Sequence, residues 1–208
     1  MIVIGLTGSI GMGKSVAAAL IRRVLKIPVH DSDAVVHRLM GPGGAAVPAI
    51  AKVFPGVVGV DGVDRQTLGA RVFAEPDALR RLEAILHPRV RSVTRTWIGH
   101  QRRLRRSVVV LDIPLLFETG GEAMCDAVIV VSAPAFLQRQ RVLRRPGMTE
   151  AKLRGILAQQ APDSVKRRRA DRVISSGLGR GVTAKALITA IRKLRGGRSR
   201  RRLTAGNM

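Results

Sequence analysis

The sequence IVIGLTGSIGMGKS fills residues 2–15 and joins an apolar run to a glycine-rich segment. Residues 8–15 have the spacing G-x-x-x-x-G-K-S of a P-loop, and the apolar run before them predicts a buried parallel strand. Glycines let successive backbone N–H groups turn toward one anion, and the helix expected next adds the positive end of its dipole. We therefore expect this segment to bind the phosphates of a nucleoside triphosphate.

Two side chains of the loop have predicted roles in phosphate and metal binding. Lys14 can reach the β- and γ-phosphates, and the hydroxyl of Ser15 can ligate Mg²⁺. The other nucleotide contacts are expected from the loop and the first helical turn, at Gly11, Met12, Gly13 and Val16. ATP and Mg²⁺ are therefore the expected co-substrate and metal ion.

Strand-like and helix-like segments alternate along most of the chain. Further apolar runs that predict strands lie at residues 29–30, 107–112, 127–131 and 172–174. Strands that alternate with helices indicate a three-layer α/β/α fold around a parallel sheet. We expect one such domain over residues 1–195 and a basic, disordered tail over residues 196–208.

Two helical regions interrupt this alternation. Residues from about 34 to 105 are predicted to be mostly helical and form a candidate substrate-binding insertion. Within it, Asp77 is expected to cap one helix, and Pro88 is expected to begin the next. Residues from about 134 to 165 form an Arg-rich segment, and Thr149 can cap its second helix. A mobile lid over ATP would fit this second region.

Carboxylates follow two of the predicted strands. Asp31 and Asp33 come after the second strand, at the sheet edge where ligands of parallel α/β folds bind. If the segment stays extended, both point to the same side, and Asp33 can take the proton of an acceptor hydroxyl. Asp31 serves equally well as a helix cap. Asp112 either holds Mg²⁺ through a water molecule or caps a turn.

Composition narrows the choice of partners. The formal net charge is +23, but the arginines are spread along the chain and only 2% of the residues are aromatic. Because few aromatic faces are available for base stacking, we expect a solvated basic surface and no specific nucleic acid partner. Cys125 is the only cysteine, so no intrachain disulfide forms. No apolar run approaches the ~18 residues of a membrane span, and we expect a cytoplasmic monomer.

Several motifs carry a resemblance to a known family. They are the P-loop from Gly5 to Ser15, V-x-D-x-D at 29–33, L-E-x-I-x-H-P at 82–88, P-L-L-F-E at 114–118, Q-x-x-R-x-x-x-R at 138–145 and A-D-x-V-I at 170–174. In this order they resemble the dephospho-coenzyme A kinases. The resemblance implies a P-loop fold of the nucleoside-monophosphate-kinase type. It also implies transfer of a phosphoryl group from ATP to the ribose 3′-hydroxyl of dephospho-coenzyme A, giving coenzyme A and ADP.

The resemblance also selects residues. It implies catalytic roles for Lys14, Asp33 and Arg141, a contact of Arg145 with ATP, and a contact of His87 with the acceptor. On spacing alone, a structural role of His87 is favoured over a functional one. Spacing alone also does not show which arginine of the lid acts in catalysis.

Two features leave alternatives open. Ser175-Ser176 stands after the last strand, where the family usually has a pair drawn from Asp, Asn and Thr. The sequence therefore leaves open which side chains contact the adenine of ATP. A P-loop and an Asp-Ser-Asp segment also occur in shikimate kinases. Another small-molecule kinase is therefore the nearest alternative, and a nucleic-acid-binding NTPase is a more distant one.

Overall fold

The computed structural model describes residues 1–196, apart from the side chains at positions 73, 74 and 76. The basic tail predicted from residue 196 therefore lies outside the described residues, except for its first position. The chain divides into two compact units. Met1–His30 and the part that begins at Arg105 form unit 1, and Asp31–Leu104 forms unit 2.

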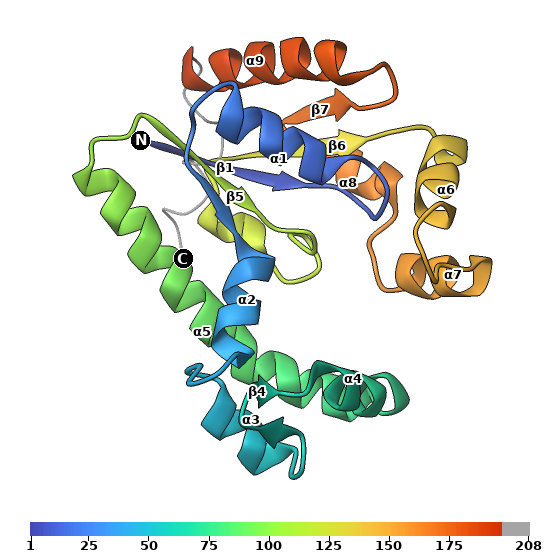
Figure 1. Ribbon diagram of the computed structural model, residues 1–208. Helices are drawn as coiled ribbons and strands as arrows, with labels where there is room; N and C mark the ends of the chain where they lie inside the picture. The colour runs from blue at the N-terminus through green and yellow to red at the C-terminus, as the bar shows by residue number, and fades with distance from the viewer. Residues whose placement is uncertain (197–208) are drawn as a thin grey trace, which may run out of the picture. The chain divides into compact units, whose positions relative to one another are not determined.

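A five-stranded sheet is the centre of unit 1 (Figure 1). Its strands, in the order β2-β5-β1-β6-β7, are β2 (Val29–Asp31), β5 (Val108–Asp112), β1 (Ile2–Thr7), β6 (Ala127–Ser132) and β7 (Arg172–Ser175). The pairings β1–β5, β1–β6 and β6–β7 are parallel. Every residue of β5 and β6 is buried, as their unbroken Val and Ile runs predict. The predicted parallel sheet is confirmed.

Helices complete the layers around this sheet. They are α1 (Lys14–Arg23), α6 (Ala135–Leu143), α7 (Glu150–Ala158), α8 (Asp163–Arg169), α9 (Arg180–Gly196) and the short 3₁₀ helix η1 (Gly121–Met124). Ile21 of α1 and Leu187 of α9 pack with Ile4 and Leu6 of β1 in one core. From the other side of β1, Cys125 approaches Gly5 so closely that a Cβ there would lie 2.8 Å from its Sγ. Both faces of the sheet are therefore covered, as the α/β/α prediction requires.

Unit 2 has its own core and is mostly helical. Its elements are α2 (Ser32–Met40), α3 (Val47–Val53), β3 (Val58–Gly59), β4 (Gly62–Val63), α4 (Arg65–Ala74) and α5 (Pro76–Arg103). Val35, Ile50 and Phe54 are among the buried residues that form its core. The antiparallel hairpin of β3 and β4 lies within the stretch that the sequence predicts to be mostly helical.

The prediction of two helices around Pro88 is wrong, because α5 runs unbroken through this proline. Glu75 is the N-cap, and Asp77 lies in the first turn, where it pairs with Arg80 instead of capping. A proline inside a helix removes one backbone donor, which usually ends the helix. Here the buried face continues across it, with Leu82 and Leu86 before it and further apolar residues after it. Tertiary packing outweighs the local penalty.

Candidate active site

The phosphate-binding loop lies between β1 and α1, at the carboxyl end of the central strand. Gly11 and Gly13 have φ angles of 77° and 90°, a left-handed conformation that favours glycine. Gly13 is the N-cap of α1, so the helix begins at Lys14. The N–H groups of the first turn of a helix have no acceptor within the helix. The loop and this turn therefore present backbone donors suited to an anion.

Lys14 forms an ion pair with Asp112. Nζ of Lys14 lies 2.6 Å from Oδ1 of Asp112, and both side chains are largely buried. The parallel register sets this contact, because Asp112 ends β5 beside Leu6 of β1, two residues before the loop begins. The carboxylate offsets the charge of Lys14 and holds its amine near the loop. The sequence predicts that Asp112 holds Mg²⁺ or caps a turn, but it does not predict this pairing with Lys14.

The oxygen groups near Lys14 suit a hard cation. Ser15 is exposed on the first turn of α1, and Asp112 supplies a carboxylate at the end of β5, the strand next to β1. Mg²⁺ prefers such oxygen ligands and keeps several waters and phosphate oxygens around it. In the described part of the chain, no three His, Cys, Asp or Glu residues cluster as a metal site. The hydroxyl of Ser15 and the carboxylate of Asp112 are nevertheless oxygen ligands of the kind that Mg²⁺ prefers.

Arg141 of α6 reaches the phosphate-binding loop. Its Nη2 donates to the backbone oxygen of Ser176 at 2.9 Å, and its Nη1 donates to the hydroxyl of Ser176 at 3.0 Å. Nη1 also lies 3.4 Å from the carbonyl oxygen of Gly11. Arg145 follows the end of α6 and is exposed, whereas Arg139 pairs with Glu150 of α7. Of these three arginines, the structure brings only Arg141 to the loop.

The predicted acceptor-side residues lie in unit 2. Asp31 caps α2, since its Oδ1 accepts a hydrogen bond from the N–H of Ala34 at 3.0 Å. The helix begins at Ser32, so the segment does not stay extended, and the condition for a same-side arrangement of Asp31 and Asp33 is not met. Asp33 is exposed in the first helical turn. His87 is half-buried on α5, directly before Pro88.

Three further side chains contact the loop that the sequence analysis did not single out as site residues. The amide of Gln138 donates to the carbonyl of Ile10 at 2.8 Å, and the amide oxygen of Gln160 accepts from the N–H of Ile10 at 3.1 Å. The hydroxyl of Ser176 donates to the carbonyl of Met12 at 2.7 Å. Gln138 occurs within the motif quoted at 138–145, and that was the signal available for it.

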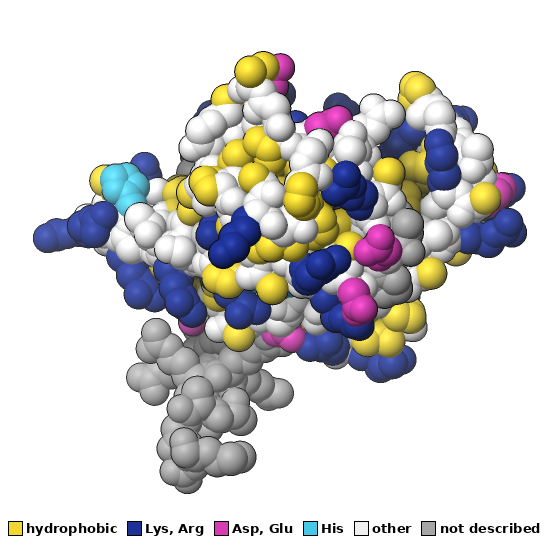
Figure 2. All heavy atoms as spheres, turned by 90° about the horizontal axis from the view of Figure 1, so that it is seen from below, with side chains coloured by type: hydrophobic (Ala, Val, Ile, Leu, Met, Phe, Trp, Pro, Cys, Tyr) yellow, Lys and Arg dark blue, Asp and Glu magenta, His cyan; other side chains and the backbone are white. Residues whose placement is uncertain are grey.

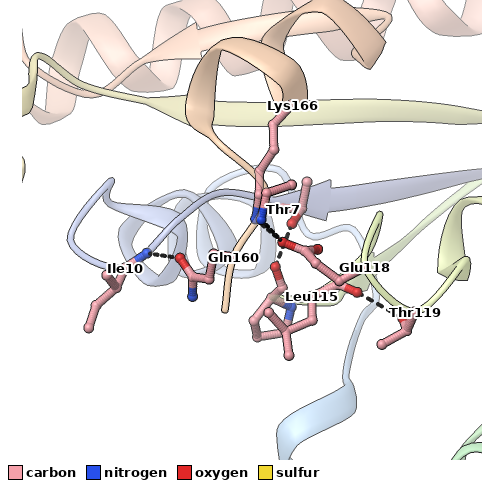
Figure 3. Close-up of polar contacts among 9 residues, drawn as sticks. Thr7, Ile10, Leu115, Glu118, Thr119, Gln160 and Lys166 are labelled. Atoms are coloured by element: carbon pink, nitrogen blue, oxygen red, sulfur yellow. Dashed lines mark hydrogen bonds and ion pairs between the residues drawn. The ribbon is translucent and has the colours of Figure 1, made fainter. Parts of the chain in front are cut away.

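A buried ion pair supports the segment that carries Gln160 (Figure 3). Nζ of Lys166, which is 0% exposed, lies 2.9 Å from Oε1 of Glu118, and the same oxygen accepts from the N–H of Ala161 at 2.8 Å. Burial raises the pKa of Glu118. The hydrogen bonds from Lys166 and from the N–H of Ala161 lower it by more than burial raises it, so the pKa lies below its usual value. The chain beside Gln160 is thereby anchored to the segment after β5.

The basic side chains are dispersed over the face of the molecule that Figure 2 shows. Figure 2 shows Lys and Arg side chains scattered among hydrophobic and polar ones on one face, without a continuous basic stripe. This distribution agrees with a solvated surface. Among the helices of residues 1–196, none is long and apolar enough to span a bilayer.

Comparison with known proteins identifies the family. The family model of dephospho-CoA kinase matches residues 2–178. A dephospho-CoA kinase from Rhodospirillum rubrum is 57% identical over 94% of this chain and 92% of its own. One from Mesorhizobium japonicum is 54% identical over 95% of this chain and 99% of its own.

Solved structures agree in fold. The crystal structure of TT1252 from Thermus thermophilus has a TM-score of 0.80 and 34% identity, covering 92% of this chain and 96% of that one. A shikimate kinase from Acinetobacter baumannii, in complex with shikimate, has a TM-score of 0.52 at 19% identity over 93% and 95% of the two chains. That likeness shows the fold alone. With a family match over most of its length and relatives above half identity, the chain belongs to the dephospho-CoA kinase family.

Proposed function

We propose that this protein transfers the γ-phosphoryl group of ATP to the ribose 3′-hydroxyl of dephospho-coenzyme A, giving coenzyme A and ADP. The observation that carries the proposal is the convergence of two cations on one phosphate-binding loop. Lys14 comes from the loop itself and Arg141 from α6, and Arg141 lies within 3.4 Å of a loop carbonyl. A chain of this family with such a loop has the groups that phosphoryl transfer needs.

The loop supplies the donor side of the reaction. Its backbone N–H groups hold the phosphates, and Lys14 and Arg141 stabilise the charge that spreads over the γ-phosphoryl oxygens as it leaves ADP. Ser15, and Asp112 through water, would hold Mg²⁺, which neutralises phosphate charge when bound. The remaining predicted contacts are the backbone at Gly11, Met12, Gly13 and Val16, and the side chain of Arg145.

Asp33 and His87 supply the acceptor side. In the transfer, the 3′-oxygen forms a bond to the γ-phosphorus as the bond from that phosphorus to the bridging oxygen breaks. The bonding electrons leave with ADP, and the proton of the hydroxyl passes to the carboxylate of Asp33. The support for Asp33 is that it is exposed while its neighbour Asp31 is occupied as a helix cap. His87 would contact the acceptor beside it.

An acceptor comparison tests the proposal. Purified protein is supplied with ATP and Mg²⁺ and with either dephospho-coenzyme A or shikimate, and ADP release is followed. We expect turnover only with dephospho-coenzyme A, and a product whose new phosphate is assigned to the 3′ position by phosphorus NMR. Turnover of shikimate alone, or a product phosphorylated elsewhere, would contradict it.

Because all proposed groups lie on one chain, we also expect specific activity to be independent of protein concentration.

A further inference from the structure

Three successive carbonyl groups of the phosphate-binding loop each accept a hydrogen bond from a side chain outside the loop. The carbonyl of Ile10 accepts from Gln138, that of Gly11 from Arg141, and that of Met12 from Ser176. The first and last of these bonds are short, at 2.8 and 2.7 Å. Two parts of unit 1 that are distant in sequence, α6 and the segment after β7, thus hold the loop.

These bonds also fix the loop's N–H groups. In a trans peptide the C=O of one residue and the N–H of the next point in opposite directions, and the described chain has no cis peptide. Holding the carbonyls of Ile10 and Met12 therefore fixes the N–H groups of Gly11 and Gly13 on the opposite side. The N–H between them, that of Met12, donates within the loop to the carbonyl of Ser9 at 3.1 Å.

Glycine peptides need such restraint. Gly11 and Gly13 have φ angles of 77° and 90°, and a glycine crosses between positive and negative φ at little cost. A loop with two of them can turn its donors away from the phosphates unless something outside holds it. Gln138 and Ser176 are suited to this, because both are buried, at 8% and 9% exposed, and neither can rotate freely into solvent.

We propose that Gln138 and Ser176 are positioning residues that keep the N–H groups of Gly11 and Gly13 turned toward the phosphate chain of the nucleotide. Gln160 supports the same arrangement from the other side of Ile10, by accepting from its N–H (Figure 3). The inference rests on nucleotide binding at this loop, which belongs to the proposed function. It adds a link between the loop and the predicted lid, because Gln138 lies on α6 and Gln160 follows Gln159, the C-cap of α7.

The two glutamines allow a sharp test because they act with opposite polarity. Gln138→Glu replaces a donor by an acceptor and sets a carboxylate against the carbonyl of Ile10. Gln160→Glu keeps an acceptor for the N–H of Ile10. Both variants add one negative charge beside the same residue, so electrostatic repulsion of phosphate is similar in the two. The difference between them therefore isolates the donor at Gln138. Gln140→Glu, on the exposed side of α6, is the matched control.

The readout is calorimetric binding of Mg·ADP and of inorganic tripolyphosphate. We expect Gln138→Glu to weaken both ligands at least about ten-fold relative to Gln140→Glu, since one hydrogen bond is lost and an acceptor faces an acceptor. Gln160→Glu should weaken them less. A buried carboxylate that faces a carbonyl should also lower the melting temperature of Gln138→Glu, so binding is measured where each variant is folded. Equal binding by Gln138→Glu and Gln140→Glu would overturn the proposal, and so would a loss for ADP with tripolyphosphate unchanged.

Ser176→Ala keeps the proposal testable if Gln138→Glu does not fold. It removes the hydroxyl that donates to Met12 and accepts from Nη1 of Arg141, while leaving the backbone oxygen that accepts from Nη2 of Arg141. We expect about five-fold weaker binding of both ligands, with Ser164→Ala, exposed on α8, as the control. Unchanged binding would overturn the role of Ser176. If the wild-type protein itself bound no ADP, the proposed function would fail; if it bound ADP and the variants matched their controls, only this inference would fail.

Discussion

The phosphate-binding loop of unit 1 and the acidic segment at the start of unit 2 both carry predicted chemistry, yet they are built differently. In the loop, Lys14 is paired with Asp112, and carbonyls are held by side chains from α6 and from the segment after β7. In the acidic segment, Asp31–Asp33, the side chain of Asp31 accepts from the N–H of Ala34 in the first turn of α2, and Asp33 is exposed. The donor side is thus fixed by long-range contacts and the acceptor side by local backbone. Substitutions in the two regions should separate nucleotide affinity from turnover.

Lys14→Ala should have the largest effect. The variant removes the cation that we propose stabilises the transferred phosphoryl group, and with it the ion pair to the buried carboxylate of Asp112. We expect kcat to fall at least about 10³-fold, with weaker ADP binding as well. Steady-state kinetics and calorimetry measure the two quantities. Lys185→Ala, exposed on α9, is the control. A Lys14→Ala enzyme that keeps a tenth or more of the control's kcat would refute a role in stabilising the transferred group.

Asp33→Asn tests the other side of the comparison. It keeps the shape of the side chain but removes the base, so we expect kcat to fall about 10²- to 10³-fold. ADP affinity should stay within about two-fold, because Asp33 belongs to unit 2 and has no proposed nucleotide contact. Asp77→Asn, exposed at the start of α5, is the matched control. Equal losses in kcat and in ADP affinity would show that the two regions are not separate in function.

Arg141 and Arg145 allow a comparison within one arginine-rich segment. Arg141→Ala should lower kcat/KM about 10²-fold, because this guanidinium lies at the loop where charge develops. Arg145→Ala should lower kcat/KM less than about five-fold, since water can take the place of an exposed charged side chain at little cost. Arg144→Ala is the control for loss of surface charge. An Arg145→Ala effect as large as that of Arg141→Ala would show that Arg145 contacts ATP, as the family resemblance implies, although the structure leaves its side chain exposed.

The sequence predicted well what depends on local pattern. The strands follow from unbroken apolar runs such as Val108–Asp112, and the loop conformation follows from Gly11 and Gly13. It failed at Pro88, because a buried face shared with the rest of unit 2 outweighs the local rule. It also missed Ser176 as a loop contact. The bond from Ser176 to Met12 joins residues 164 positions apart, and such contacts are set only by the assembled sheet.

Glu118→Gln should give the smallest catalytic effect and a measurable loss of stability confined to unit 1. The variant leaves Lys166, 0% exposed, without a counter-charge. We expect a loss of about 2 kcal/mol in the free energy of unfolding, below the range for fully buried pairs because Glu118 is partly exposed to water. Hydrogen exchange should rise in α8 and stay unchanged in α5. Faster exchange in both helices would show that the ion pair of Glu118 and Lys166 stabilises unit 2 as well as unit 1.

The pH dependence of this loss gives a further check. Burial raises the pKa of Glu118, but its bonds with Lys166 and the N–H of Ala161 outweigh that effect, so the folded-state pKa is lowered. The group therefore stabilises the fold fully above its unfolded pKa of about 4.3, and this contribution is lost as pH falls through the lowered pKa. Glutamine does not titrate in this range. The difference in unfolding free energy between wild type and Glu118→Gln should accordingly be constant near neutral pH and shrink below about pH 4. A difference that grows in acid would mean that Glu118 is protonated more readily in the folded protein, and that the carboxylate does not anchor the segment beside Gln160.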